Sequence, residues 1–147
     1  MQIRNDAEMQ RRRCKNEHFI RESSRRKIFP MIDPAKITGY HAHIYYDEAS
    51  RGRAARIREM IEANFKVVMG RWRDMPVGPH PQPMYQVAFG TEEFPRIVPW
   101  LMLNRDGLIV LVHPETGDAY TDHAVNPLWL GEKLQLNVEM LRHLPKS

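Results

Sequence analysis

Cysteine is almost missing from this chain, because Cys14 is the only one among its 147 residues. A framework of internal disulfides is therefore excluded, and so little cysteine is typical of a protein from a reducing compartment. No apolar run approaches the roughly 20 residues that a membrane-spanning helix needs. No apolar segment follows the N-terminus in the manner of a secretory signal. We therefore expect a cytoplasmic protein that has no membrane partner.

Acidic charge is scarce at one end of the chain. The formal net charge is +4, of which residues 1–36 contribute +5, with ten Lys and Arg against five Asp and Glu, and residues 37–147 contribute −1. Because the basic segment has little apolar content, we expect a flexible, solvated N-terminal tail before a single folded domain at 37–147. An arginine-rich arm can bind nucleic acid through its phosphates. The folded domain lacks a basic stripe with interleaved aromatic residues, which argues against nucleic acid as the partner.

Apolar periodicity in the folded domain predicts four strands and two helices in the order β-α-β-β-α-β. The strands are expected at residues 37–46, 66–73, 84–90 and 108–114, and the helices at 51–65 and within 91–107. Prolines and a glycine in "DMPVGPHPQP" predict an irregular loop before the third strand. Residues 115–147 are expected to form an irregular extension, with a short helical turn around "PLWLGEKL".

The second helix has an alternative interpretation. Apolar residues recur there at i, i+3, i+4, i+7 and i+8, Thr91 suits the N-cap, and Gly107 suits the position after the last turn. Pro99 interrupts this pattern, so we expect a kink at that residue. A hairpin with a strand at 98–103 is the alternative.

The predicted order is the split βαβ, or ferredoxin-like, arrangement of an α+β protein. Its two helices cover one face of the sheet, and the other face is left for a partner or a ligand. We therefore expect two copies to close face to face into a homodimer, a dimeric α+β barrel.

Five histidines lie at positions that such a sheet would bring together. His41 and His43 share one face of the first strand, because side chains alternate across a strand. His80 lies in the proline-rich loop, His113 ends the fourth strand, and His123 follows in the C-terminal extension. Neutral imidazole nitrogens suit iron, zinc, copper or nickel, but a histidine is more often a hydrogen-bonded structural residue. By themselves the five histidines leave the metal site and the structural interpretation about equally open.

Four longer strings resemble the DOPA 4,5-dioxygenase family of aromatic ring-opening enzymes in order and spacing. They are "YHAHIYYD", "VGPHPQPMYQVAF", "VPWLMLNRDGLIVLVHPETGD" and "DHAVNPLWLGE", and the resemblance covers about residues 37–136. It implies a small ferredoxin-like protein that forms a dimeric α+β barrel. It also implies an extradiol dioxygenase that opens a catechol such as L-DOPA with non-haem Fe(II) and molecular oxygen. The resemblance is much less specific for the substrate than for the family.

The resemblance places all five histidines at the family's histidine-bearing positions. On it we expect His41, His43 and His113 to bind the metal. The usual facial triad of such oxygenases consists of two histidines and one carboxylate, but no Asp or Glu is expected on the His41 and His43 face of a strand. The site is therefore either all-histidine or takes a carboxylate from Asp122 or Glu115.

The same resemblance leaves two histidines for acid–base chemistry. We expect His80 or His123 to be the catalytic acid–base residue, since histidine titrates in the range that proton transfer needs. Asp122 is expected to orient His123, and Tyr45 is a further candidate partner of an imidazole nitrogen. The "RWR" run at 71–73 could meet the carboxylate and ring of a substrate, although a surface position at a strand end is the simpler interpretation.

Two other functions stay open at this point. Many proteins of this fold bind ligands without turnover, so a metal- or ligand-binding ferredoxin-like module is one alternative. A different metalloenzyme, such as a zinc-dependent hydrolase, is the other.

Overall fold

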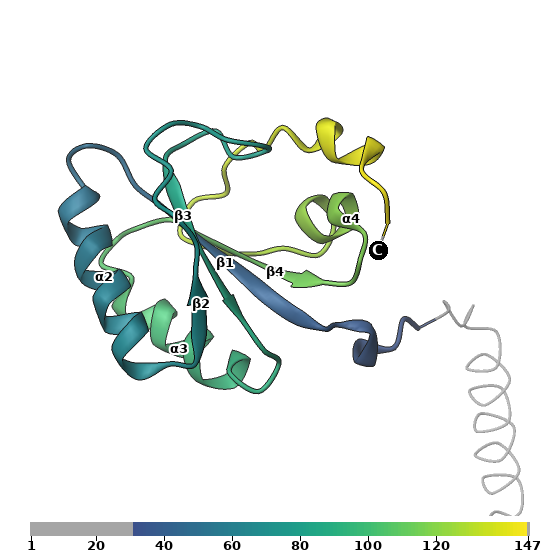
Figure 1. Ribbon diagram of the computed structural model, residues 1–147, viewed down its shortest axis with the longest axis horizontal. Coiled ribbons are helices and arrows are strands. Elements are labelled where there is room, and N and C mark those ends of the chain that lie inside the picture. Colours follow the sequence, from purple (N-terminus) through teal and green to yellow (C-terminus); the bar gives the residue numbers. More distant parts are fainter. Residues whose placement is uncertain (1–30, 147) are drawn as a thin grey trace, which may run out of the picture. The chain divides into compact units, whose positions relative to one another are not determined.

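The structure, a computed structural model, describes residues 31–146. The basic tail predicted at 1–36 falls mostly on residues 1–30, outside the described residues, so its flexibility stays a prediction. A short 3₁₀ helix, η1 (Pro34–Lys36), precedes the first strand. From there the chain enters an α+β fold (Figure 1).

Five strands form one antiparallel sheet in the spatial order β2-β3-β1-β4-β5. They are β1 (Gly39–Tyr45), β2 (Val67–Met69), β3 (Met84–Phe89), β4 (Val110–Glu115) and β5 (Leu128–Leu130). The first four are the predicted strands, and β1 and β3 lie side by side between β2 and β4, as the predicted order requires. Strand β1 is therefore flanked on both edges, so its side chains lie at the centre of the sheet.

Strand β5 lies where the sequence predicts a helical turn, so that prediction is wrong. Its three residues pair antiparallel with Val110, Leu111 and Val112 of β4. Without β5, that edge of β4 would expose unpaired backbone N–H and C=O groups. Pairing to the edge decides the conformation of this segment, and local sequence does not report it.

Two helices cover one face of the sheet, α2 (Arg51–Asn64) and α3 (Phe94–Asn104) (Figure 1). Helix α3 continues through Pro99, so the hairpin alternative is wrong. The N-cap is Glu93 and not Thr91, because the helix begins later than its first polar residues suggest. None of the helices within residues 31–146 combines the length and the apolar character needed to cross a bilayer. The cytoplasmic location stays a prediction.

The main core lies between these helices and the sheet. Ala42 and Ile44 are fully buried there, and Tyr46 is nearly so. They pack against apolar residues that recur at helical spacing on α2 and α3: Ala54, Ile57, Ile61, Ile97, Val98 and Leu101. Because side chains alternate along β1, the odd-numbered residues of this strand point to the opposite face.

The opposite face is partly covered by the C-terminal extension, which is not irregular as predicted. It contains helix α4 (Ala119–Ala124), β5 and a 3₁₀ helix, η2 (Val138–His143). A second, smaller apolar cluster lies under it, formed by Tyr45, Met84, Leu111 and Leu136. The extension therefore encloses part of the face on which the predicted site residues lie.

Candidate metal centre

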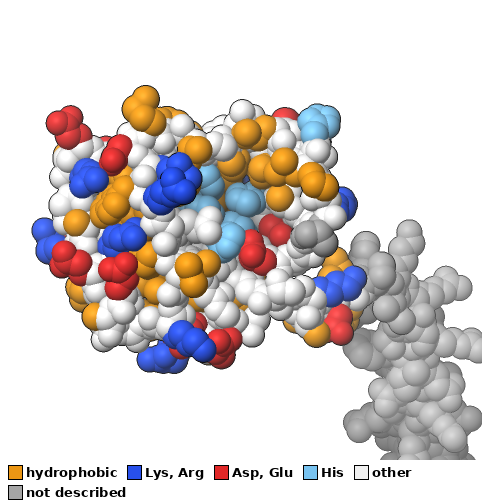
Figure 2. All heavy atoms as spheres, viewed as in Figure 1, with side chains coloured by type: hydrophobic (Ala, Val, Ile, Leu, Met, Phe, Trp, Pro, Cys, Tyr) orange, Lys and Arg blue, Asp and Glu red, His pale blue; other side chains and the backbone are white. Residues whose placement is uncertain are grey.

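The five predicted histidines meet on the sheet face that α2 and α3 leave uncovered. The imidazole rings of His43 and His80 are 4.1 Å apart, and those of His113 and His123 are 3.9 Å apart, between centroids. The ring of His41 lies 5.2 Å from that of His113. Figure 2 shows the histidine side chains gathered at the middle of this face. The prediction that they converge is confirmed.

Strand register places three of these rings. His41 and His113 are direct partners across β1 and β4, and His43 is two residues along on the same face. The other two rings come from outside the sheet. His80 follows a tight turn closed by a bridge to Val77, and His123 lies on α4. Rigid strands therefore position one side of the cluster, and the loop and the extension add the other.

The histidines form two overlapping groups of three. Within each group, the ligand nitrogens all lie within 4.8 Å of one another. The first group is His41, His43 and His113, the set expected to bind metal. The second is His43, His80 and His123, which contains both expected acid–base residues. His43 belongs to both groups, so it stands at the centre of the cluster.

Three of the rings have an oxygen beside Nδ1. These contacts are His41 with Glu115 Oε1 at 3.1 Å, His113 with the Pro114 carbonyl at 2.9 Å, and His123 with the Ala119 carbonyl at 2.8 Å. Carboxylate and carbonyl oxygens only accept hydrogen bonds, so each Nδ1 carries the proton, and in a neutral ring Nε2 then presents a lone pair. Histidines that bind metals are held in this way.

The distance between the Nε2 atoms of His43 and His113 shows whether the cluster fits a metal ion. Their Nε2 atoms lie 3.1 Å apart, and Nδ1 of His43 is buried without a hydrogen-bond partner. At metal–nitrogen distances of about 2.1 Å, two ligands at a right angle lie about 3.0 Å apart. The observed spacing therefore suits two nitrogens that share one ion. An all-imidazole donor set of this kind fits iron, zinc, copper or nickel.

Burial keeps the cluster neutral. It lowers the pKa of His80 to about 4 and that of His113 to about 3, with a further lowering from the neighbouring His123. It also brings the pKa of His43 well below the usual range, and lowers the pKa of His41 and His123. Desolvation is the largest cause in each case, because a charged imidazolium loses its hydration on burial. Neutral rings are the form that binds metals at neutral pH.

Glu115 and Asp122, the two carboxylates considered from sequence, lie in different surroundings. Glu115 is the last residue of β4 and contacts His41, so the expectation that no strand carboxylate shares the His41 face is wrong. Asp122 is buried, and it accepts hydrogen bonds from the backbone N–H of Thr116 at 2.9 Å and from its hydroxyl at 2.6 Å. The described contacts therefore give His123 the carbonyl of Ala119 as its orienting partner in place of Asp122. Consecutive helical residues point in different directions, which separates Asp122 from the ring of its neighbour.

Tyr45 is the partner of His80. Its hydroxyl lies 2.7 Å from His80 Nδ1, and its ring stacks with Trp129 of β5 at 6.1 Å. Burial raises the pKa of this hydroxyl, so it stays protonated. Sequence reasoning missed the carbonyls of Pro114 and Ala119, since every residue has such a group and no side-chain pattern marks the ones that matter.

The "RWR" run is split between the two faces of the sheet. Trp72 packs in the main core, edge-on to Tyr46 and Tyr85 with ring centroids 5.2 and 5.0 Å away. It is therefore separated from the histidines by the sheet. Arg71 and Arg73 instead line a pocket of about 480 Å³ beside the cluster.

A family model and one curated relative name the same family. The model of the Dopa 4,5-dioxygenase family matches residues 40–140. A 21.2 kDa uncharacterized protein of Botryotinia fuckeliana is 31% identical over 143 residues, which cover 89% of this chain and 78% of that protein. A DOPA 4,5-dioxygenase of Amanita muscaria is 30% identical over 116 residues, 73% of this chain and 51% of that enzyme, so the match spans about half of its length.

A solved structure is more similar still. The crystal structure of a candidate dioxygenase from Nostoc punctiforme is 61% identical and superimposes with a TM-score of 0.76. The match covers 76% of this chain and 97% of that chain. The similarity thus extends over nearly all of the Nostoc chain.

Proposed function

Because the chain belongs to the Dopa 4,5-dioxygenase family, we propose that it is an extradiol dioxygenase that depends on non-haem iron and opens a catechol. In this reaction the ring C–C bond beside the diol breaks, and each carbon of that bond receives one atom of dioxygen. The product is a ring-opened acid with a semialdehyde. The observation that carries the proposal is the cluster of five imidazoles on one sheet face.

We assign the metal to His41, His43 and His113. Two of these rings have the outer partners that ligating histidines need, a carboxylate from Glu115 and the carbonyl of Pro114. Ferrous iron, when bound, supplies the Lewis acidity and one-electron chemistry by which a catechol and molecular oxygen react. Three protein ligands leave room for a substrate beside them.

The two remaining histidines act on the substrate and the product. His123 donates Nδ1–H to a carbonyl, so its Nε2 is an acceptor and serves as the base that takes a proton from a catechol hydroxyl. In His80 the proton lies on the other ring nitrogen. We assign the Tyr45 hydroxyl as the donor to Nδ1, so that Nε2 of His80 carries a proton and donates a hydrogen bond to the product enolate. The imidazolium formed on His123 is the acid that returns its proton to the product.

We further propose that the chain pairs into a homodimer in which two ferredoxin-like sheets close into an α+β barrel. The order of the first four strands supports this arrangement. Beyond the C-terminal extension, Val68 is 72% exposed beside Ala88 on the histidine face, where a second sheet would cover it. Sedimentation equilibrium tests the dimer, and a monomer at all concentrations contradicts it.

The decisive experiment is an anaerobic metal analysis followed by a catechol panel. The protein is loaded with ferrous iron, mixed with catechols and exposed to oxygen. We expect one iron per chain and a yellow semialdehyde that absorbs in the visible. His41→Ala and His113→Ala should lose the metal while their circular dichroism spectra stay native, and His143→Ala, an exposed histidine outside the cluster, should retain both metal and activity.

Two outcomes contradict the proposed function, and a third contradicts the ligand assignment. Bound iron without colour from any catechol would indicate a binding module without turnover. Stoichiometric zinc that survives chelation would instead indicate a zinc enzyme. Full metal occupancy in His41→Ala would show that the ligand assignment is wrong.

A further inference from the structure

A pocket of about 480 Å³ opens beside His80 on the histidine face. One wall is the end of the β2 segment, another is β3, and the third is the turn before His80. The lining residues are Met69, Gly70, Arg71, Arg73, Val77, Gly78, His80, Met84 and Gln86. Gln86 is the register partner of His43, so the pocket borders the centre of the cluster.

The chain just after β2, at residues 70–73, contains one extra residue relative to β3, and this directs both arginines to the pocket. Met69 pairs with Val87 and Arg73 with Met84, so the three residues 70–72 face only two residues of β3. Such an insertion is a β-bulge, which redirects a side chain. A Cβ on Gly70 would lie 3.2 Å from that of Gln86, which places position 70 on the histidine face, and Arg73 shares that face with its partner Met84.

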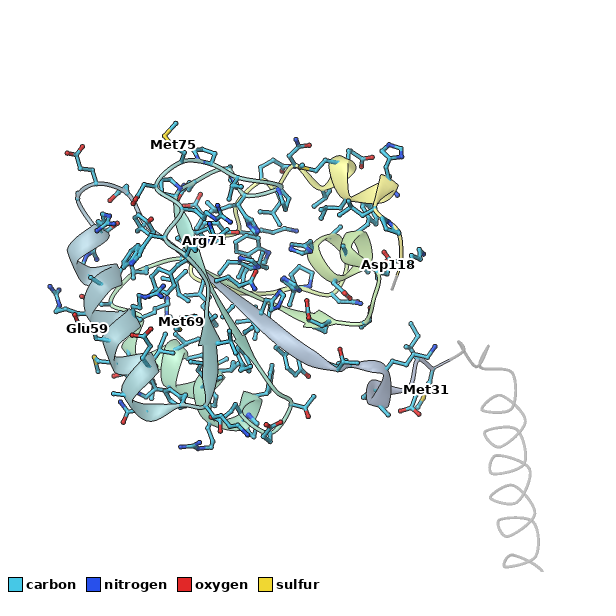
Figure 3. The ribbon with its side chains drawn as sticks, in the orientation of Figure 1. Met31, Glu59, Met69, Arg71, Met75 and Asp118 are labelled. Carbon is cyan, nitrogen blue, oxygen red and sulfur yellow. The ribbon has the colours of Figure 1, made fainter. Side chains whose placement is uncertain are left out.

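Neither Arg71 nor Arg73 has an ion-pair or side-chain hydrogen-bond partner among residues 31–146, whereas other arginines do. Arg51 pairs with Asp74 at 2.9 Å, for example. The lining of the pocket contains no Asp or Glu among the described residues. In Figure 2 a group of Lys and Arg side chains directly adjoins the central histidines on one side, and a group of Asp and Glu side chains directly adjoins them on another. Figure 3 labels Arg71 near this centre. Two unpaired guanidinium groups therefore mark one end of the site.

We propose that Arg71 and Arg73 bind an anionic carboxylate at the end of the substrate's side chain, so that the enzyme selects acidic catechols over neutral and cationic ones. The inference rests on the proposed function and deepens it. A guanidinium fork matches the two oxygens of a carboxylate. A substrate ammonium group finds no acidic partner in the pocket and is repelled by the same two charges. Arg71 and Arg73 are thus specificity residues.

The test compares ligands that differ only in charge. Dihydrocaffeate carries a carboxylate, its methyl ester is neutral, and dopamine carries an ammonium group. Anaerobic calorimetry with the purified protein should show dihydrocaffeate binding about tenfold or more tightly than the ester, since hydrogen bonds to charged groups are worth at least that ratio. Dopamine should bind most weakly. Arg71→Gln and Arg73→Gln should each weaken binding of the acid by about tenfold and leave the ester within about twofold.

Arg56→Gln is the matched control. It removes the same charge from an exposed position on α2, on the other side of the sheet. Equal affinity for acid and ester, binding of neither, or an equal loss in the control would each overturn the inference. Ring opening of 4-methylcatechol, which has no charged side chain, is measured separately. Its failure would contradict the proposed function, while the binding comparison still decides the role of the two arginines.

Discussion

Replacing Glu115 by Gln tests which of the two histidine groups that share His43 binds the metal. The carboxylate of Glu115 contacts only the first group, through Nδ1 of His41 at 3.1 Å. The hydroxyl of Tyr45 contacts only the second, through Nδ1 of His80 at 2.7 Å. If the first group binds iron, Glu115→Gln should weaken iron binding and Tyr45→Phe should not.

The expected loss of iron affinity in Glu115→Gln depends on how exposed the contact between His41 and Glu115 is. A hydrogen bond to a charged group contributes about 1.5–3 kcal/mol. The side chains of His41 and Glu115 are 21% and 44% exposed, so water screens the interaction and the lower end applies. A loss of about 1.4 kcal/mol corresponds to tenfold weaker binding. Outer partners of ligating histidines generally contribute about 10- to 100-fold to metal affinity, which agrees.

The assay is an anaerobic competition titration of ferrous iron against a chelator. Circular dichroism establishes that each variant is folded. Glu132→Gln removes an exposed carboxylate elsewhere in the C-terminal extension and should bind iron like the unmodified protein. Tyr45→Phe should bind iron within about twofold but open catechols more slowly, because His80 loses the donor that sets its tautomer.

The opposite pattern would refute this reasoning. Unchanged iron affinity in Glu115→Gln, together with weakened affinity in Tyr45→Phe, would move the metal to the group of His43, His80 and His123. His80 and His123, to which we assign roles toward the product and the catechol proton, would then be metal ligands. His41 would become a structural residue.

Two further predictions concern stability. Burial lowers the pKa of His80 to about 4 and of His113 to about 3 from 6.5, so below pH 6.5 the unfolded chain binds more protons than the folded one. The free energy of unfolding of the metal-free protein should therefore fall from pH 6.5 to 5, by up to about 1.4 kcal/mol per pH unit and histidine. Urea titrations check this, and a free energy of unfolding that does not change between pH 6.5 and 5 would contradict it. Leu101 is fully buried and Leu103 is 87% exposed, so Leu101→Ala should cost about 2–5 kcal/mol and Leu103→Ala less than about 0.5 kcal/mol, and equal losses would contradict the packing.

The second helix shows where local pattern sufficed. Its apolar residues recur at helical spacing, and three of them, Ile97, Val98 and Leu101, are buried against the sheet. Pro99 removes one backbone donor, yet the helix runs through it. Burial of an amphipathic face outweighs one lost hydrogen bond. The spacing was therefore the better guide than the single proline.

Strand β5 shows where local pattern failed. The segment at 128–130 has no strong strand signal of its own, and its conformation comes from pairing with β4. That pairing joins residues brought together only by the folded chain. Helix α4 is different, because its start carries a local signal: the side chain of Asp118 accepts a hydrogen bond from the N–H of Thr121.

The sequence alone predicted that His41 and His43 share one face of a strand and that five imidazoles converge on the sheet, because alternation along a strand and the βαββαβ order follow from short-range patterns. It also identified the family. The tertiary structure alone decided which oxygens lie beside four of the rings, that His43 belongs to two groups, and that Trp72 lies across the sheet from Arg71. These depend on strand register, on a bulge and on the path of the C-terminal extension. Such features arise from contacts between residues far apart in the chain, whose energies no local pattern reports.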